Sequence, residues 1–235
     1  MKRFTKALAS IMLMTAVIFT VGCKKDNADG DGTVNGHTYV DLGLPSGTLW
    51  AACNVGANTP EECGDYFAWG ETTTKTNYDW ITYKYCNNGD LKQLTKYCND
   101  THYGYNGFTD NLFFLQTIDD AATINWGDGW CMPTMEQCEE LFEHTAQIFT
   151  IQNGVYGMLF SASNGASLFL PAAGIRWYGE LYNIGDYGYY WSSLLNIDHP
   201  FRARYFFIGP GTFDVNDYRR FNGLSVRAVC SAPQN

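Results

Sequence analysis

The sequence predicts an α+β domain in which short antiparallel strands dominate, two helices are present, and strands near the two ends pair. Three observations predict this class. Asn-Gly dipeptides occur six times, and Asn-Gly favours tight hairpin turns because both of its residues accept a positive φ. An amphipathic segment follows Pro133. Similar apolar runs at residues 48–52 and 224–229 indicate that the first and last strands meet in one sheet.

Residues 1–22 have the pattern of a secretory signal peptide. Basic side chains stand at positions 2, 3 and 6, and residues 7–22 form an apolar run. A membrane-spanning helix needs about 20 apolar residues, so this run is short for one. Gly22 precedes Cys23, and TVGC at residues 20–23 resembles a bacterial lipobox with Thr20 in the place of the usual Leu. We expect a lipoprotein acylated on Cys23; an ordinary signal peptide is the alternative.

The charge of the exported part limits its partners. The first 22 residues hold three of the 15 Lys and Arg and none of the 24 Asp and Glu, so the remaining 213 residues carry a net charge of −12. Such a balance disfavours nucleic acid, whose phosphates require basic patches, and direct adsorption to anionic lipid. Contact with the membrane is therefore expected through acyl chains on Cys23.

Residues 23–36 are small and polar without periodicity, which predicts a flexible tether. The acidic residues that follow Cys23 resemble the tag that sends some Gram-negative lipoproteins to the outer surface. We therefore expect an outer-membrane lipoprotein at the cell surface. The expected organisation is a signal peptide at 1–22, a tether at 23–36, one domain at 37–231 and a tail at 232–235.

The elements of the domain follow from local patterns. Residues 148–170 alternate strand-like runs with Asn-Gly turns, which predicts a three-strand meander. A short helix is expected over residues 121–126, with Asp119 or Asp120 as its N-cap. The stronger helix follows Pro133, because Thr134 and Gln137 have the spacing of a capping box.

Eight cysteines are present, and Cys23 is assigned to lipid. Export makes disulfides possible, but seven remaining thiols leave at least one unpaired. No CxxC motif occurs, and the spacings match no usual zinc knuckle. Cys86 and Cys98 are the best predicted bridge, because YKYC and TKYC flank a polar loop.

Six strings in order resemble the Fibrobacter succinogenes major paralogous domain (FISUMP) family, and they span about 190 residues. They are YVDLGLPSGTLWAACNVGA (39–57), GDYFAWGE (64–71), DDAATINWGDGWCMPTMEQCEEL (119–141), LFLPAAGIR (168–176), GYYWSS (188–193) and GLSVRAV (223–229). The resemblance implies an exported, often lipid-anchored domain with a C-type-lectin-like fold: two helices, a closing sheet made from the two ends, and a long looped face.

The chain departs from the family pattern at four cysteines: Cys63, Cys131, Cys138 and Cys230. These additional thiols predict bridges particular to this chain, and Cys138 with Cys230 is one candidate pair. Such a bridge would close a long loop, for which about 4 kcal/mol of stabilisation is expected in the absence of strain.

The sequence offers no catalytic constellation. It contains no G-x-S-x-G, H-E-x-x-H or Walker motif, and its four histidines are scattered. Asp119 and Asp120 are expected to cap a helix rather than to act as acid and base. The sugar-binding calcium motifs of C-type lectins and the late cysteine pair of formylglycine-generating enzymes are both missing. Asp214, Asn216 and Asp217 are interpreted as a polar turn rather than a cation site. We expect no enzyme activity, cofactor or metal.

An aromatic-rich face is the best candidate binding site. Aromatic residues and Arg are enriched in binding hot spots. The residues proposed for it are Trp177, Tyr178, Tyr182, Tyr187, Tyr189, Arg202, Arg204 and Arg219. The neighbouring Tyr190 and Trp191 cannot both face outward from one strand, because successive side chains point to opposite faces.

The sequence therefore favours a non-catalytic, lipid-anchored surface domain that recognises a glycan or a protein through this face. A structural subunit or adhesin-like component of a surface assembly is the alternative. An enzyme is the third and least favoured hypothesis.

Overall fold

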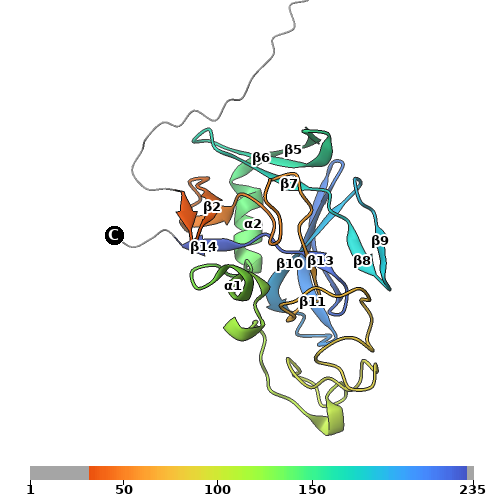
Figure 1. Cartoon of the computed structure of the whole chain (residues 1–235). Coiled ribbons are helices and arrows are strands. Elements are labelled where there is room, and N and C mark those ends of the chain that lie inside the picture. The colour runs from red at the N-terminus through yellow and green to blue at the C-terminus, as the bar shows by residue number, and fades with distance from the viewer. Residues whose placement is uncertain (1–31, 232–235) are drawn as a thin grey trace, which may run out of the picture. The chain divides into compact units, whose positions relative to one another are not determined.

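Four small sheets and two helices form the part of the chain that the structure describes, residues 32–231 of a computed structural model (Figure 1). These residues belong to one compact unit. The class is mixed α+β with strands predominant, as the sequence predicts. The signal peptide, Cys23, most of the tether and the predicted tail lie outside the described residues. No helix within residues 32–231 has the length and apolar character to cross a bilayer.

The bounds of the elements are as follows. The strands are β1 (Thr33–Val34), β2 (His37–Val40), β3 (Thr48–Ala51), β4 (Tyr66–Phe67), β5 (Thr145–Gln152), β6 (Val155–Ala162), β7 (Ser167–Pro171), β8 (Ile175–Trp177), β9 (Glu180–Tyr182), β10 (Gly188–Leu195), β11 (Arg202–Gly209), β12 (Thr212–Arg219), β13 (Leu224–Ser225) and β14 (Val229–Ser231). The α-helices are α1 (Ala121–Trp126) and α2 (Met135–Glu143), and single 3-10 turns lie at Tyr105–Gly107 and Thr117–Asp119.

The two ends of the domain share the sheet β1-β2-β3-β14, in which β14 pairs antiparallel with β3. The predicted pairing of the terminal strands is therefore confirmed. The predicted last strand at residues 224–229 is divided, since β13 joins β10 and β4 in another sheet. The folded part also begins before residue 37, because the Asn35–Gly36 turn, with φ of 50° and 81°, connects β1 to β2.

Both helices and the meander follow the predicted local signals. Asp120 caps α1 by accepting from the backbone N–H groups of Ala122 (2.9 Å) and Thr123 (3.0 Å). Thr134 and Gln137 form the capping box of α2. Strands β5, β6 and β7 form the three-stranded antiparallel meander, with Asn153 at a positive φ in the first turn.

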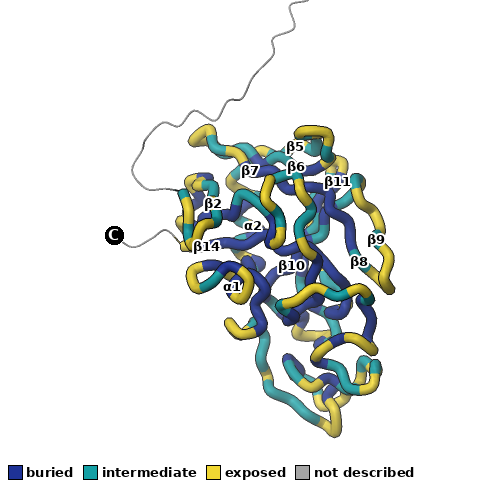
Figure 2. The backbone as a smooth tube through the Cα atoms, in the orientation of Figure 1, coloured by how far each residue is buried: buried dark blue, intermediate teal, exposed yellow. Residues whose placement is uncertain are grey.

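The five-stranded sheet β12-β11-β10-β13-β4 separates two hydrophobic cores. Tyr190 packs into the core that contains α2, and Trp191 packs into the core that contains α1. Both side chains are fully buried, because each face of β10 is covered (Figure 2). The prediction that the two side chains cannot both face outward is therefore confirmed: they point in opposite directions, and both directions lead into the protein.

The two predicted disulfides are not formed in the structure, in which Cys86, Cys98, Cys138 and Cys230 are free thiols. The Cys86 thiol donates to the Asp90 carbonyl oxygen (3.1 Å), and the Cys98 thiol donates to that of Asp100 (3.2 Å). Cys138 and Cys230 lie in different hydrophobic cores, which explains why a bridge between them is not made.

Candidate functional site

The β8–β9 hairpin presents the exposed aromatic side chains that the sequence analysis singles out. Its turn consists of Tyr178 and Gly179, with φ of 47° and 83°. A positive φ is uncommon for a bulky residue such as Tyr178, and such strain is concentrated at functional sites. The Trp177 ring centroid lies 5.4 Å from that of Tyr178 and 6.0 Å from that of Tyr182. Three aromatic rings are thus held together on one exposed hairpin.

A pocket of about 200 Å³ lies beside this hairpin, and we call it the Arg219 pocket. It is lined by Trp177, Arg202, Tyr218, Arg219 and Asn222. Arg202 begins β11 and Arg219 ends β12, so the two arginines are direct cross-strand partners. The fold therefore brings an indole ring, a phenol ring and two guanidinium groups to one hollow.

A second hollow of about 170 Å³, the Tyr182 pocket, shares two walls with the first. Its lining consists of Ile175, Trp177, Tyr182, Asn183 and Tyr218. The Asn183 amide donates to the Tyr189 hydroxyl at 2.9 Å, which ties the end of the hairpin to β10. Because Trp177 and Tyr218 line both hollows, the two pockets are neighbours along one aromatic cleft.

Several buried polar atoms in the Arg219 pocket have no hydrogen-bond partner. Both amide atoms of Asn222 are unpaired, although this residue is fully buried. The Nε atom of Arg202 is also buried and unpaired, while its NH1 atom binds Asp217 at 2.6 Å. Buried polar groups are normally satisfied, so each exception calls for an explanation. A ligand that supplies the missing partners is one such explanation.

The structure brings together only part of the predicted face. Five of its residues lie at or beside the two pockets: Trp177, Tyr178, Tyr182, Arg202 and Arg219. The other three line neither pocket: Tyr187, Tyr189 and Arg204. Tyr187 and Tyr189 instead pack against Phe207 on the neighbouring strand, and Arg204 lies opposite Asp217.

Four residues that line the two pockets are not in the face predicted from the sequence: Ile175, Asn183, Tyr218 and Asn222. In the sequence, Asn222 stands out only as part of an Asn-Gly turn signal, and Asn183 and Tyr218 belong to no binding motif. Strand alternation would instead have placed Tyr218 on the opposite face from its neighbour Arg219, so it gave no indication that both line one pocket. No local signal reveals that the Asn222 amide lacks partners.

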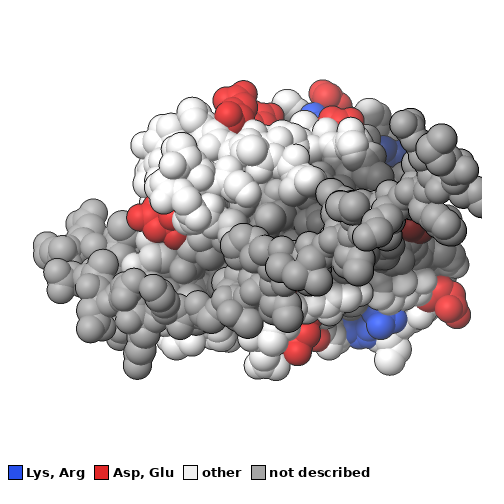
Figure 3. All heavy atoms as spheres, turned by 90° about the horizontal axis from the view of Figure 1, so that it is seen from above, with Lys and Arg blue, Asp and Glu red and all other residues white. Residues whose placement is uncertain are grey.

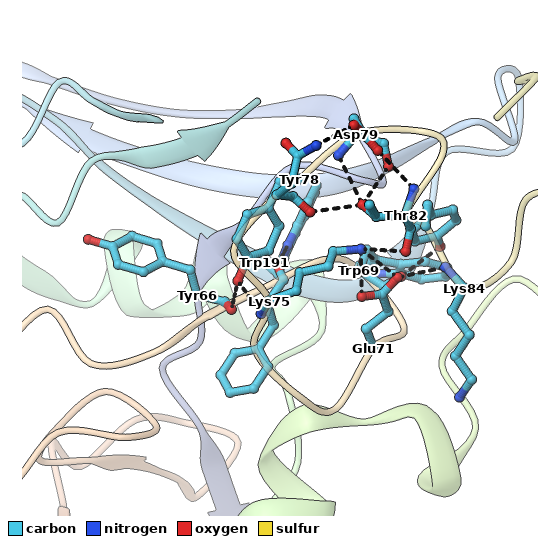
Figure 4. A network of polar contacts seen from close by, with 12 residues as sticks. Tyr66, Trp69, Glu71, Lys75, Tyr78, Asp79, Thr82, Lys84 and Trp191 are labelled. Carbon is cyan, nitrogen blue, oxygen red and sulfur yellow. Dashed lines mark hydrogen bonds and ion pairs between the residues drawn. The ribbon is translucent and has the colours of Figure 1, made fainter. Parts of the chain in front are cut away.

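A larger hollow of about 420 Å³ lies near Lys75, Tyr66 and Tyr78, and the polar groups of Lys75 and Tyr78 are engaged within the protein. The Lys75 ammonium binds Glu71 at 2.8 Å and the Thr82 carbonyl oxygen at 3.1 Å (Figure 4). The Tyr78 hydroxyl donates to the Tyr66 carbonyl oxygen at 2.5 Å. These contacts hold residues 71–82 in place. No side chain that lines this hollow has a buried polar atom without a partner, so the hollow is a weaker candidate than the Arg219 pocket.

The paired aspartates have structural roles. Asp120 caps α1 and also accepts from the Met132 N–H at 2.8 Å. Asp119 accepts hydrogen bonds from the Tyr85 and Tyr97 hydroxyls and from the Lys96 ammonium. Neither aspartate lines the Arg219 pocket.

Within residues 32–231, no group of three or more His, Cys, Asp or Glu side chains is arranged to hold a metal ion. The interpretation of Asp214, Asn216 and Asp217 as a polar turn is wrong, because all three lie within strand β12. Asp217 is paired with Arg202, and Asp214 and Asn216 are exposed. Comparison with known proteins adds no likeness to these observations: no family model matches the chain, and no curated protein or solved structure matches it significantly.

Proposed function

We propose that this protein is a non-catalytic binding domain that takes a glycan into the cleft formed by the Arg219 and Tyr182 pockets. One observation carries the proposal: unpartnered polar atoms of Asn222 and Arg202 lie between aromatic walls. Ligand sites generally combine apolar and aromatic walls with a few polar groups that fix orientation. A protein segment that presents the same groups is the second possible ligand of this face.

The proposal does not include a reaction. The Arg219 pocket is lined by two arginines, one asparagine and two aromatic residues. General acid–base catalysis normally uses groups that change protonation near neutral pH, such as histidine or a perturbed carboxyl. The lining contains neither, which supports binding rather than turnover. A broad hydrolase screen that found robust turnover by the purified protein would contradict this part of the proposal.

We further propose a C-type-lectin-like fold and a place in the FISUMP family. The pairing of β3 with β14, the two helices and the long loops between residues 68 and 116 support this assignment. So do the six sequence strings given above. Solved coordinates of a recognised family member that superpose on this topology would test it, and a different strand order would contradict it.

The proposed location is the cell surface, with the domain held to the outer membrane by acyl chains on Cys23. The apolar run, the TVGC motif and the acidic residues that follow support this location. Metabolic labelling with a fatty acid should mark the mature chain and should fail for Cys23→Ser. Protease treatment of intact cells should then degrade the anchored protein. An unlabelled mature chain, or one retained in the cytosol, would contradict the proposal.

Aromatic substitutions test the binding face directly. Trp177 and Tyr182 are 37% and 44% exposed, and Tyr105, which lies outside both pockets, is 42% exposed. We expect Trp177→Ala and Tyr182→Ala to abolish most glycan-array signal, while Tyr105→Ala leaves it unchanged. Binding should persist in a chelator, because the proposed site uses no metal. Equal signal from all three variants would reject this site.

A structural subunit of a surface assembly, with an adhesin-like role, is the alternative. The specific observation in its favour is the exposure of Ile148, Ile151 and Tyr156 on the β5–β6 hairpin. In Figure 3, which shows the molecule from above, the surface that grey atoms do not cover is mostly uncharged, with a few carboxylates and basic groups at its edges. Cross-linking on intact cells distinguishes the two hypotheses. A stoichiometric protein partner favours the assembly, and glycan signal without one favours the binding domain.

A further inference from the structure

The Arg219 pocket carries an unusual arrangement of positive charge. Arg202 and Arg219 are direct partners across β11 and β12, and like charges in that position destabilise a sheet. Asp217 is the acid bound to Arg202, at 2.6 Å. Arg219 is exposed, and no acidic side chain lines the pocket. The positive charge of Arg219 therefore has no acidic partner in the lining of the pocket, although the protein is strongly acidic overall.

The unpartnered atoms define which groups a ligand would need. The Nε of Arg202 is a donor and requires an acceptor. The Asn222 amide offers both a donor and an acceptor, and it is fully buried in the wall of the pocket. A carboxylate matches guanidinium groups well, because it accepts two parallel N–H hydrogen bonds. A hydroxyl beside it would satisfy both atoms of an amide, since a hydroxyl donates and accepts.

The dimensions of the pocket restrict the ligand further. Drug-sized ligands occupy pockets of about 300–1,000 Å³, whereas the Arg219 pocket has about 200 Å³ and its neighbour about 170 Å³. Each hollow therefore suits one ring-sized unit rather than a long enclosed chain. The shared walls, Trp177 and Tyr218, place two such units side by side.

We propose that the ligand is an acidic oligosaccharide whose carboxylate-bearing sugar occupies the Arg219 pocket. Arg219 and the Nε of Arg202 bind the carboxylate, Asn222 binds an adjacent hydroxyl, and the next sugar lies between Trp177 and Tyr182. The inference rests on the proposed function, because it names the class of glycan for the same cleft. An acidic peptide could also present a carboxylate, but the pair of ring-sized hollows with aromatic walls favours sugar rings.

The test compares acidic oligosaccharides with their methyl esters, which lack the negative charge and carry one additional methyl group, and with the corresponding neutral oligosaccharides. The probes are oligosaccharides that contain galacturonate, glucuronate or sialate, and affinity is measured by calorimetry on the intact chain. We expect at least one acid to bind 10-fold or more tightly than its ester. Arg219→Gln should remove this preference. Arg204→Gln is the matched control, because Arg204 lies on the same sheet but outside the pocket, and it should preserve the preference.

The outcomes separate the two proposals. If acids and esters bind equally and Trp177→Ala still abolishes binding, the carboxylate inference is overturned and the proposed glycan function stands. If none of the probes binds but an acidic peptide does so in an Arg219-dependent manner, the glycan assignment is overturned. If neither class binds, both proposals fail. Asn222→Leu, which removes an unpartnered amide without leaving a cavity, should weaken acid binding while the chain remains folded.

Discussion

Arg227 donates its Nε hydrogen to the side-chain oxygen of Asn54 at 2.8 Å, across 173 positions of the chain. Its NH1 atom donates to the carbonyl oxygens of Ala51 (3.0 Å) and Ala52 (2.6 Å), and its NH2 atom donates to that of Phe169 (3.0 Å). The guanidinium is completely buried and is held by neutral oxygens. It thereby joins the segment between β13 and β14 to the end of β3.

Asn54→Ala should destabilise the protein by about 2 kcal/mol or more, because it leaves a buried donor of a charged group without a partner. The same change frees the Cys63 carbonyl oxygen, which accepts from the Asn54 amide at 2.8 Å. Chemical denaturation measures the loss. Asn58→Ala is the control, since Asn58 is exposed and should change the free energy of unfolding little. Equal stability of the two variants would show that Arg227 finds other partners.

The buried Asp119 carboxylate should make stability fall in acid. Burial alone would raise its pKa, but hydrogen bonds from Lys96, Tyr85 and Tyr97, together with the Lys96 charge, hold the pKa below its usual value. In the unfolded chain the pKa is about 3.9. The unfolded state therefore binds more protons than the folded state, and the contribution of Asp119 is present above about pH 4 and disappears as the pH falls through the folded pKa.

Asp119→Asn tests this contribution by denaturation between pH 3 and 7. The variant should be less stable at pH 7, and its difference from the unmodified protein should shrink as the pH falls. Burial raises the pKa of the neighbouring Asp120, so Asp120 changes stability with pH in the opposite direction to Asp119. The difference in stability between the variant and the unmodified protein is therefore more informative than the pH dependence of either protein alone. Asp128→Asn changes an exposed carboxylate and should follow the unmodified protein. A constant difference at every pH would contradict the prediction.

The helices and the meander were predictable because they depend on interactions between residues close in sequence. The sheet to which each strand belongs was not predictable in this way. The capping box at Thr134 and the positive φ of Asn153 depend on residues a few positions apart. The division of residues 224–229 depends on distant partners: β13 pairs with β4 and β10, while Arg227 holds the next residues against Ala51 and Ala52. Alternation along the segment indicates a strand but does not say which sheet receives it.

Composition predicted part of the candidate site but not all of it. Clustered aromatic residues and arginines drew attention to Trp177, Tyr182 and Arg219, which the structure does bring to one cleft. Tyr187 and Tyr189 share that composition but pack against Phe207. The importance of Asn222 comes from what its amide does not contact, and a missing hydrogen bond has no signature in a sequence.

The free thiols of Cys138 and Cys230 lead to a test by mutant additivity. Cys138 projects from α2 into one core, where burial raises its pKa well above the usual value, and Cys230 belongs to the other core. Substitutions at independent sites add in their effects on stability. Cys138→Ala and Cys230→Ala should therefore each cost about 1 kcal/mol, and the double variant should cost their sum. If a bridge joined the two residues, each single variant would instead lose as much as the double variant.

Asn222→Leu should change stability and ligand binding in opposite directions. The Asn222 side chain is fully buried and neither of its polar atoms has a partner, so the folded protein carries a desolvation cost that an apolar side chain of similar size removes. We expect the variant to be more stable by on the order of 1 kcal/mol and to bind acidic oligosaccharides more weakly.

Thermal denaturation without ligand and binding calorimetry with the acidic probes, on separate aliquots of one preparation, measure the two effects. Asn216→Leu is the matched control, because Asn216 is exposed on the neighbouring strand β12 and should alter neither property. Stabilising changes commonly reduce function where a site is kept unsatisfied for its ligand. A destabilised Asn222→Leu protein would instead mean that the amide has a structural role, and the argument for a ligand at this position would lose its main support.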